Sequence, residues 1–128
     1  MILSTKKRAA ALAAITATAL FAGAWAAPFH LHLLKSTPAA NTTVTAAPDS
    51  IQLWFSQAPE IKVTTVKVTG PGNAAVPLTP LAKRDSAGVA AAVKGAMKAG
   101  GYTVAWRTMA KDGHVASGTF AFTVGATR

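Results

Sequence analysis

Three histidines and one aspartate are the residues of this chain whose types and spacing suit metal chemistry. His30 and His32 stand together near its start, and Asp112 precedes His114 by two positions. Residues two apart in an extended segment face the same side, so each pair can present both side chains to one ligand. An imidazole nitrogen beside a carboxylate oxygen suits Cu(II) in tetragonal geometry, and copper binds such sets more tightly than other divalent ions. The spacing allows a copper site if folding brings the two histidines near the start of the chain close to Asp112 and His114.

The same residues also have an ordinary structural interpretation. A histidine on a strand is commonly a surface residue, and Asp-Gly is a frequent turn dipeptide. The sequence has no cysteine, which excludes disulfides, zinc–thiolate sites and thiol nucleophiles. It has no Gly-x-Ser-x-Gly, no phosphate-binding glycine loop and no His-Glu-x-x-His, so we expect no enzyme. Spacing alone leaves a metal site and a plain surface turn both open.

Residues 1–26 predict an export signal. Lys6–Arg8 form a positively charged start, and residues 9–22 form an uncharged apolar run that is too short to span a bilayer comfortably. A small-x-small site then favours cleavage after residue 26. We therefore expect a signal peptide over 1–26 and an exported domain over 27–128. An uncleaved membrane anchor is the alternative.

The basic charge of the chain does not indicate a nucleic-acid site. Loss of the signal lowers the formal net charge from +9 to +6, because Lys6, Lys7 and Arg8 go with it. The remaining cations are scattered, and only Lys83 and Arg84 are adjacent. A nucleic-acid site needs a clustered basic stripe or an aromatic stacking platform. We expect a solvated basic surface, no nucleic-acid partner, and membrane contact only through an uncleaved signal segment.

Apolar and polar residues alternate in several runs separated by turn residues, the pattern of short strands. The runs cover residues 30–33, 50–56, 62–69, 101–107 and 118–124. Residues 87–99 are rich in alanine, but their glycines weaken a helix, and we expect a strand over 89–93 that leads to a loop around Met97. Short strands with Gly and Pro turns predict an all-β sandwich.

The expected core is small, because much of the hydrophobic fraction is alanine. In the first run the histidines share one face and leave Leu31 and Leu33 for the core. The other predicted core members are Ile51, Leu53, Phe55, Val63, Val66, Val68, Tyr102, Val104, Trp106, Phe120, Phe122 and Val124.

Five segments together match the pattern of a known family. They are His30–Ala39, Pro48–Ser56, Gly101–Arg107, Asp112–His114 and Gly118–Val124. The most specific feature is the strand Gly-Tyr-x-Val-x-Trp-Arg followed by Asp-x-His. Through these segments the chain resembles the CopC-type periplasmic copper-binding family over nearly all of the expected domain.

The resemblance implies an immunoglobulin-like Greek-key β-sandwich or barrel of about seven strands. It implies a role in copper homeostasis or resistance, as a carrier or as the partner of an inner-membrane copper transport protein. The family's Cu(II) site uses the ring and the α-amine of the first mature histidine, together with the Asp-x-His pair. By position these ligands are His30, Asp112 and His114. Arg107 then either orients Asp112 or forms a plain surface ion pair.

The chain departs from the family pattern in three places. Cleavage at the predicted position leaves Ala27–Phe29 ahead of His30, which removes the α-amine from the chelate unless His32 or water fills the vacant position. Residues 69–87 contain no Met, whereas some members carry a methionine-rich Cu(I) site, so we expect none here. Gln57 stands where a Glu is common.

Two other functions stay open at this point. An immunoglobulin-like interaction module that has lost metal binding would keep the fold alone. A copper oxidase with a His-brace centre needs a histidine at the very N-terminus, and the extension Ala27–Phe29 counts against it.

Overall fold

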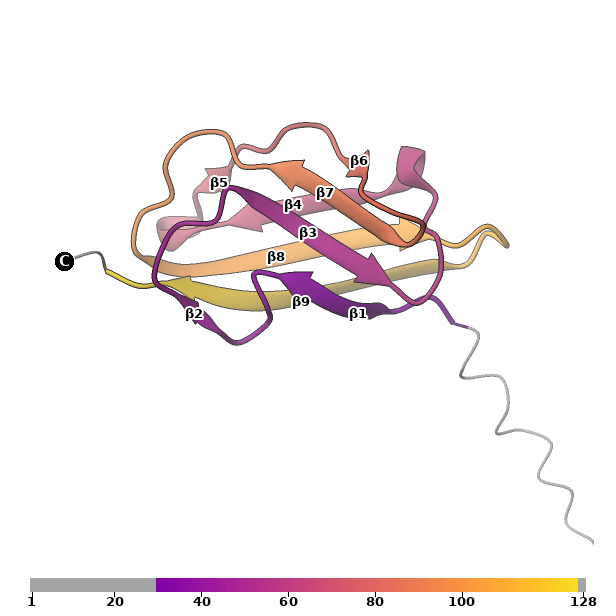
Figure 1. Cartoon of the computed structure of the whole chain (residues 1–128), viewed down its shortest axis with the longest axis horizontal. Coiled ribbons are helices and arrows are strands. Elements are labelled where there is room, and N and C mark those ends of the chain that lie inside the picture. Colours follow the sequence, from indigo (N-terminus) through magenta and orange to yellow (C-terminus); the bar gives the residue numbers. More distant parts are fainter. Residues whose placement is uncertain (1–29, 127–128) are drawn as a thin grey trace, which may run out of the picture.

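The computed structural model describes residues 30–126, whose regular elements are strands and two short 3₁₀ turns (Figure 1). The strands are β1 (Leu33–Thr37), β2 (Thr43–Val44), β3 (Ser50–Phe55), β4 (Thr65–Thr69), β5 (Ala75–Val76), β6 (Ala82–Lys83), β7 (Gly88–Ala92), β8 (Gly100–Met109) and β9 (Val115–Val124). The 3₁₀ turns are η2 (Ile61–Val63) and η3 (Pro71–Asn73). Nothing helical in residues 30–126 has the length and apolar character of a membrane span.

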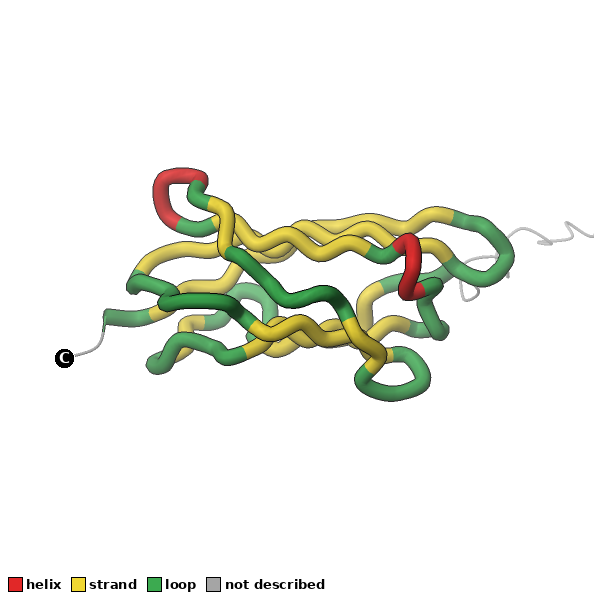
Figure 2. The backbone as a smooth tube through the Cα atoms, turned by 90° about the horizontal axis from the view of Figure 1, so that it is seen from above, coloured by secondary structure: helices red, strands yellow, loops and turns green. Residues whose placement is uncertain are grey.

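The strands form two sheets that stack as layers (Figure 2). The four-stranded sheet has the order β1-β3-β7-β6, and the five-stranded sheet has the order β2-β9-β8-β4-β5. The predicted all-β sandwich is confirmed, and the described residues hold nine strands where about seven were expected. Three of the nine, β2, β5 and β6, are two-residue strands at sheet edges, which are too short to show alternation in the sequence. β7 confirms the strand predicted within the alanine-rich segment.

The core lies between the sheets and follows the predicted alternation. Every second residue of β3 is buried, as are the even-numbered residues of β8 from 102 to 108. Phe55 from one sheet meets Trp106 from the other edge to face, with ring centroids 5.2 Å apart. Val66 and Phe120 pack against this core while partly exposed, and Met97 joins it at 8% exposure.

Val63 is the predicted core residue that the structure places outside the core, because its side chain is 45% exposed. The chain turns here in η2, where the N–H of Thr64 donates to the carbonyl of Ile61 at 3.2 Å. A 3₁₀ turn does not keep the period-2 alternation of a strand. Alternation begins only at Thr65, and the prediction for Val63 was wrong for that reason.

The β8–β9 hairpin is the longest paired element of the described residues. Its register runs without a break from Gly100 opposite Val124 to Met109 opposite Val115. Both strands belong to the five-stranded sheet, and their turn lies at the end of the sandwich where the described chain begins (Figure 1). The hairpin thus carries residues 110–114 to the same end as His30.

Gly118→Ala should destabilise the sandwich. Gly118 pairs with Trp106 across the hairpin, and a Cβ at position 118 would lie 2.8 Å from the indole. Since overpacking forces a core side chain off its rotamer, we expect the free energy of unfolding in urea to fall by about 1–3 kcal/mol. Gly101→Ala is the matched control: a Cβ there meets nothing within 4 Å, so stability should stay level or rise slightly. Equal stability of the two variants would contradict the tight contact at Trp106.

Candidate metal centre

The turn at the tip of the β8–β9 hairpin holds Asp112 and His114 side by side. Gly113 has a φ of +88°, a left-handed conformation that glycine adopts without strain, and its N–H donates to the carbonyl of Ala110 at 2.9 Å. The carboxylate of Asp112 accepts two hydrogen bonds from His114. One comes from the backbone N–H to Oδ1 at 3.0 Å, and one from ring Nδ1 to Oδ2 at 2.9 Å.

These hydrogen bonds set the charge and the tautomer of the pair. They hold the pKa of Asp112 below its usual value, through the backbone N–H of His114 first and its ring second, so the carboxylate is ionised at neutral pH. Because a carboxylate only accepts, Nδ1 of His114 carries the proton, and in the neutral ring Nε2 keeps its lone pair. Both side chains are open to solvent, His114 at 76% and Asp112 at 60%. Nε2 is therefore the nitrogen that His114 can offer to a metal.

The segment that carries His30 and His32 is fastened to the residue that follows β3, Ser56. The Ser56 hydroxyl oxygen accepts from the backbone N–H of His32 at 3.0 Å, and the hydroxyl donates to the carbonyl of His30 at 3.3 Å. The backbone N–H of Ser56 donates to the carbonyl of His32 at 2.9 Å. Ser56 thus joins the two histidines to the four-stranded sheet, a role that no local sequence pattern indicated.

His30 is the histidine of this segment that reaches the turn. Its ring centroid lies 6.4 Å from that of His114, with the rings at 76°. The ring of His32 turns back on its own segment, and its Nδ1 lies 2.9 Å from the carbonyl oxygen of His30. As the sequence predicted, the side chain of Leu31 between them is buried.

The two facing imidazoles lie close to the spacing that one shared ion requires. A nitrogen bound at about 2 Å puts its ring centre about 3 Å from the ion, so two rings on one ion have centres up to roughly 6 Å apart. Within residues 30–126, no three His, Cys, Asp or Glu side chains form a ready-made metal cluster. A small inward movement of His30 or His114 is therefore needed before both rings and Asp112 can share an ion.

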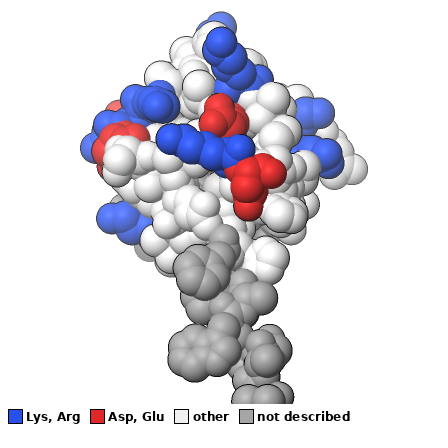
Figure 3. Space-filling model, turned by 90° about the vertical axis from the view of Figure 1, so that its right-hand side faces the viewer, with Lys and Arg blue, Asp and Glu red and all other residues white. Residues whose placement is uncertain are grey.

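The structure does not show the interaction expected between Arg107 and Asp112. Arg107 lies on the exposed face of β8 and forms no ion pair with Asp112, whose ion-pair partner among the described residues is His114. Neither of the two alternatives expected for Arg107 is found among the described residues, where the imidazole of His114 already occupies the carboxylate of Asp112. At this end of the sandwich, acidic side chains lie near the middle of the face and at its left edge, and lysine and arginine side chains lie between and around them (Figure 3).

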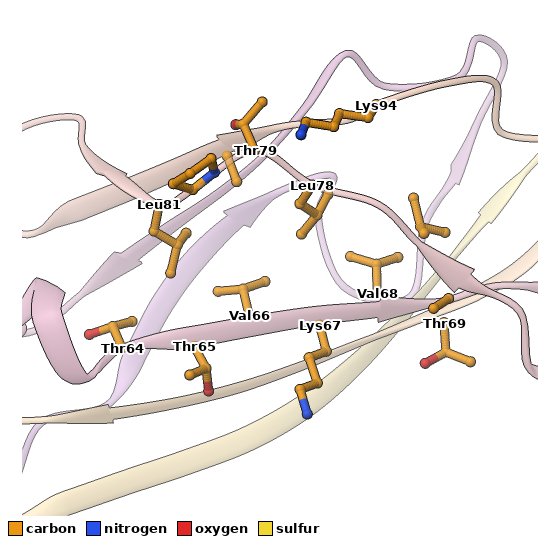
Figure 4. Close-up of a pocket in the computed structure, with 14 residues that line it drawn as sticks. Thr64, Thr65, Val66, Lys67, Val68, Thr69, Leu78, Thr79, Leu81 and Lys94 are labelled. Atoms are coloured by element: carbon orange, nitrogen blue, oxygen red, sulfur yellow. The ribbon is translucent and has the colours of Figure 1, made fainter.

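A groove of about 810 Å³ lies between β4 and residues 77–81 (Figure 4). Val66 and Val68 of β4 point into it, opposite Leu78 and Leu81. Its described lining contains no His, Met, Asp or Glu. The described lining of the groove therefore offers no such metal ligand. The candidate metal centre remains the group of histidines at the end of the sandwich.

Comparison with known proteins identifies the family. The CopC domain pattern matches residues 33–125. The chain belongs to the CopC family. Protein YobA of Escherichia coli (strain K12) is 38% identical over 117 residues, which cover 89% of this chain and 91% of YobA. Copper resistance protein C of Escherichia coli is 33% identical over 109 residues, which cover 79% of this chain and 86% of that protein.

Solved structures agree with this membership. PcoC, a methionine-rich copper resistance protein from Escherichia coli, superposes with a TM-score of 0.68 at 33% identity, covering 74% of this chain and 98% of PcoC. CopC from Methylosinus trichosporium OB3b also gives a TM-score of 0.68, at 22% identity over 77% of this chain and 97% of that one, and supports the fold alone. CopC-family chains are resistance proteins and not enzymes, which confirms that expectation. The family match includes Asp112 and His114 and begins three residues after His30.

Ser56→Ala should release His30 from His114. The substitution removes both hydrogen bonds of the hydroxyl and leaves the backbone bond from position 56, so we expect nuclear Overhauser contacts between the two rings to disappear from spectra of the copper-free chain. The free energy of unfolding should fall by only about 1 kcal/mol. Ser50→Ala, at the other end of β3, is the control and should keep the ring contacts. Contacts that survive in Ser56→Ala would mean that another interaction holds His30.

Proposed function

We propose that this CopC-family chain binds one Cu(II) ion through His30, Asp112 and His114. The observation that carries the proposal is the 6.4 Å approach of the His30 ring to that of His114, from opposite ends of the described chain. The set offers two imidazole nitrogens and one carboxylate oxygen. Such donors suit Cu(II), whereas thioether sulfurs would select Cu(I).

The hydrogen bonds of the turn support this ligand set. The lowered pKa of Asp112 keeps it ionised, and its bond to Nδ1 directs the Nε2 lone pair of His114 outward. Each carboxylate oxygen has a second lone pair, so Asp112 can hold His114 and bind the ion at the same time. Copper binding should weaken in acid, because protons compete for every one of these donors.

His32 is the reserve ligand of the proposal. Its Nδ1 donates to the carbonyl of His30, which leaves Nε2 with a lone pair in the neutral ring. If export removes residues 1–26, His30 follows Ala27–Phe29 and has no free α-amine. Water or His32 then completes the coordination, and the ion is held less tightly than by a chain that begins at His30.

The relatives suggest where this binding is used. Copper resistance protein C and PcoC are copper resistance proteins by name. That kinship supports the proposal that residues 27–128 act in the periplasm after removal of the signal, where the domain would hold Cu(II) and deliver it to an inner-membrane copper transport protein.

One observation favours a second candidate. The absence of a ready-made metal cluster within the described residues fits an interaction module that has lost copper binding. A His-brace oxidase is a weaker alternative, since it requires export to expose His30 as the first residue. The intact mass of the exported protein decides this point: a chain that begins at Ala27 removes the oxidase from consideration.

Cu(II) titration of the exported chain tests the proposal. His114→Ala and His30→Ala should each lower the affinity by at least roughly tenfold, because each removes one of two nitrogen donors. His32→Gln tests the reserve ligand, and it should lower the affinity less than His30→Ala does, because water can take the position that His32 would fill. Isothermal calorimetry gives the affinities, and the electron paramagnetic resonance spectrum reports the loss of nitrogen coupling.

Two results would contradict this assignment. Equal weak binding by the original chain and His114→Ala would favour the interaction module. A large loss in His32→Gln with none in His30→Ala would move the first ligand to His32.

A further inference from the structure

A row of residues crosses the outer face of the four-stranded sheet. Lys35 of β1 pairs with Trp54 of β3, and Trp54 pairs with Gly88 of β7. Arg84, just after β6, donates its backbone N–H to the carbonyl of Gly88 at 2.9 Å. The row thus places one cation on each side of a tryptophan, and we call Lys35, Trp54 and Arg84 the Trp54 patch.

The indole of Trp54 is held in one position. Its Nε1–H donates to Oδ2 of Asp85 at 2.9 Å, and Oδ1 of Asp85 accepts from the backbone N–H of Ala87 at 3.1 Å. A Cβ on Gly88 would come within 2.9 Å of the indole, so only glycine lets the ring lie across β7. Both oxygens of Asp85 are therefore engaged in fixing the ring.

The two cations of the patch lie at the ring, and the carboxylate of Asp85, next to Arg84 in the chain, attracts the Arg84 guanidinium weakly. Nζ of Lys35 is 4.6 Å from the indole centroid, and Cζ of Arg84 is 5.9 Å from it. Among the described residues neither forms an ion pair, since the ion pair found there joins His114 to Asp112. The ring thus orders two side chains that would otherwise lose rotamer freedom on binding a partner.

The patch lies beside the candidate metal centre. Trp54 precedes Ser56 by two residues, and Ser56 carries the hydrogen bonds to His30 and His32. Leu34, at the bulge in β1 next to Lys35, adds an aliphatic side chain that is 62% exposed. Tryptophan and arginine are the residues most enriched where proteins bind each other, and an apolar neighbour excludes water there.

We propose that the Trp54 patch docks an acidic segment of a partner protein, whose carboxylates pair with Lys35 and Arg84 across the indole. Charge complementarity favours this occupant, because the patch offers two cations, and both oxygens of Asp85, the carboxylate beside the ring, already accept hydrogen bonds from Trp54 and Ala87. Surfaces that bind anionic lipid generally present clusters of 4–8 cations, more than this row supplies. The proposal goes beyond copper binding and holds for the copper-free chain.

A peptide titration of the copper-free exported chain tests the docking. The probe is hexaglutamate, and the readout is the indole N–H resonance of Trp54 in a ¹⁵N spectrum. We expect a saturable shift, and roughly tenfold weaker binding by the double variant Lys35→Gln/Arg84→Gln, which lacks both ion pairs. Lys67→Gln/Arg107→Gln removes the same charge from the exposed face of the other sheet and should bind the peptide as the original chain does.

Three results would overturn the proposal. Equal weakening in both double variants would indicate attraction to net charge alone, and no shift with hexaglutamate would remove the site. Cosedimentation with phosphatidylglycerol vesicles that depends on Lys35 and Arg84, without a matching effect on the peptide, would assign the patch to a membrane surface. Because both double variants change exposed side chains alone, their unfolding in urea should match that of the original chain. Lys35→Gln/Arg84→Gln should bind copper as tightly as the original chain does. A failure of the docking proposal can therefore be told apart from a failure of the copper proposal.

Discussion

The contact between Phe55 and Trp106 joins the two sheets at the end of the sandwich where the histidines gather. Phe55 belongs to the four-stranded sheet and directly precedes Ser56, which fastens the segment of His30. Trp106 belongs to the five-stranded sheet and lies three residues before the end of β8, close to the turn of His114. An edge-to-face pair adds about 0.5–1.5 kcal/mol to the burial of two large rings. This core contact therefore sets the spacing of the two sheet ends, and Ser56 holds the segment of His30 at that spacing.

Because the two facing histidines come from different sheets, an ion bound between them would act as a cross-link of the sandwich. A ligand that binds only the folded chain stabilises it in proportion to its affinity and concentration. The same geometry explains why the copper-free chain need not hold a closed site. His30 is fastened through its backbone, whereas its ring makes no hydrogen bond within the described residues. The ring can therefore turn toward an ion without breaking the bonds that position it.

The sequence was sufficient for the features that depend on alternation and composition. Period-2 patterns located β3, β8 and β9, and the glycines of residues 87–99 argued correctly for a strand over a helix. The pattern failed at Val63, because a 3₁₀ turn interrupts the strand without any Gly in it. It could not separate His30 from His32, because it treated residues 30–33 as a strand with both histidines on one face. The strand β1 begins only at Leu33, and the ring of His32 bonds back to the carbonyl of His30. Ser56 and the Trp54 patch depend on contacts between distant strands, for which a single sequence carries no local signal.

The solvent exposure of its ligand side chains affects whether a metal centre exchanges its ion with a partner or retains it. Buried ions are shielded from water and from partners, whereas the side chains of His114 and Asp112 are 76% and 60% exposed. If they bind an ion as proposed, the ligands of a second protein could reach that ion before it leaves the first, and exchange would not require the sandwich to open. Such a transfer needs a partner that is held briefly and in one orientation, which weak contacts of paired charges provide. The proposed docking of an acidic segment at the Trp54 patch would meet that requirement without adding any donor that competes for the ion.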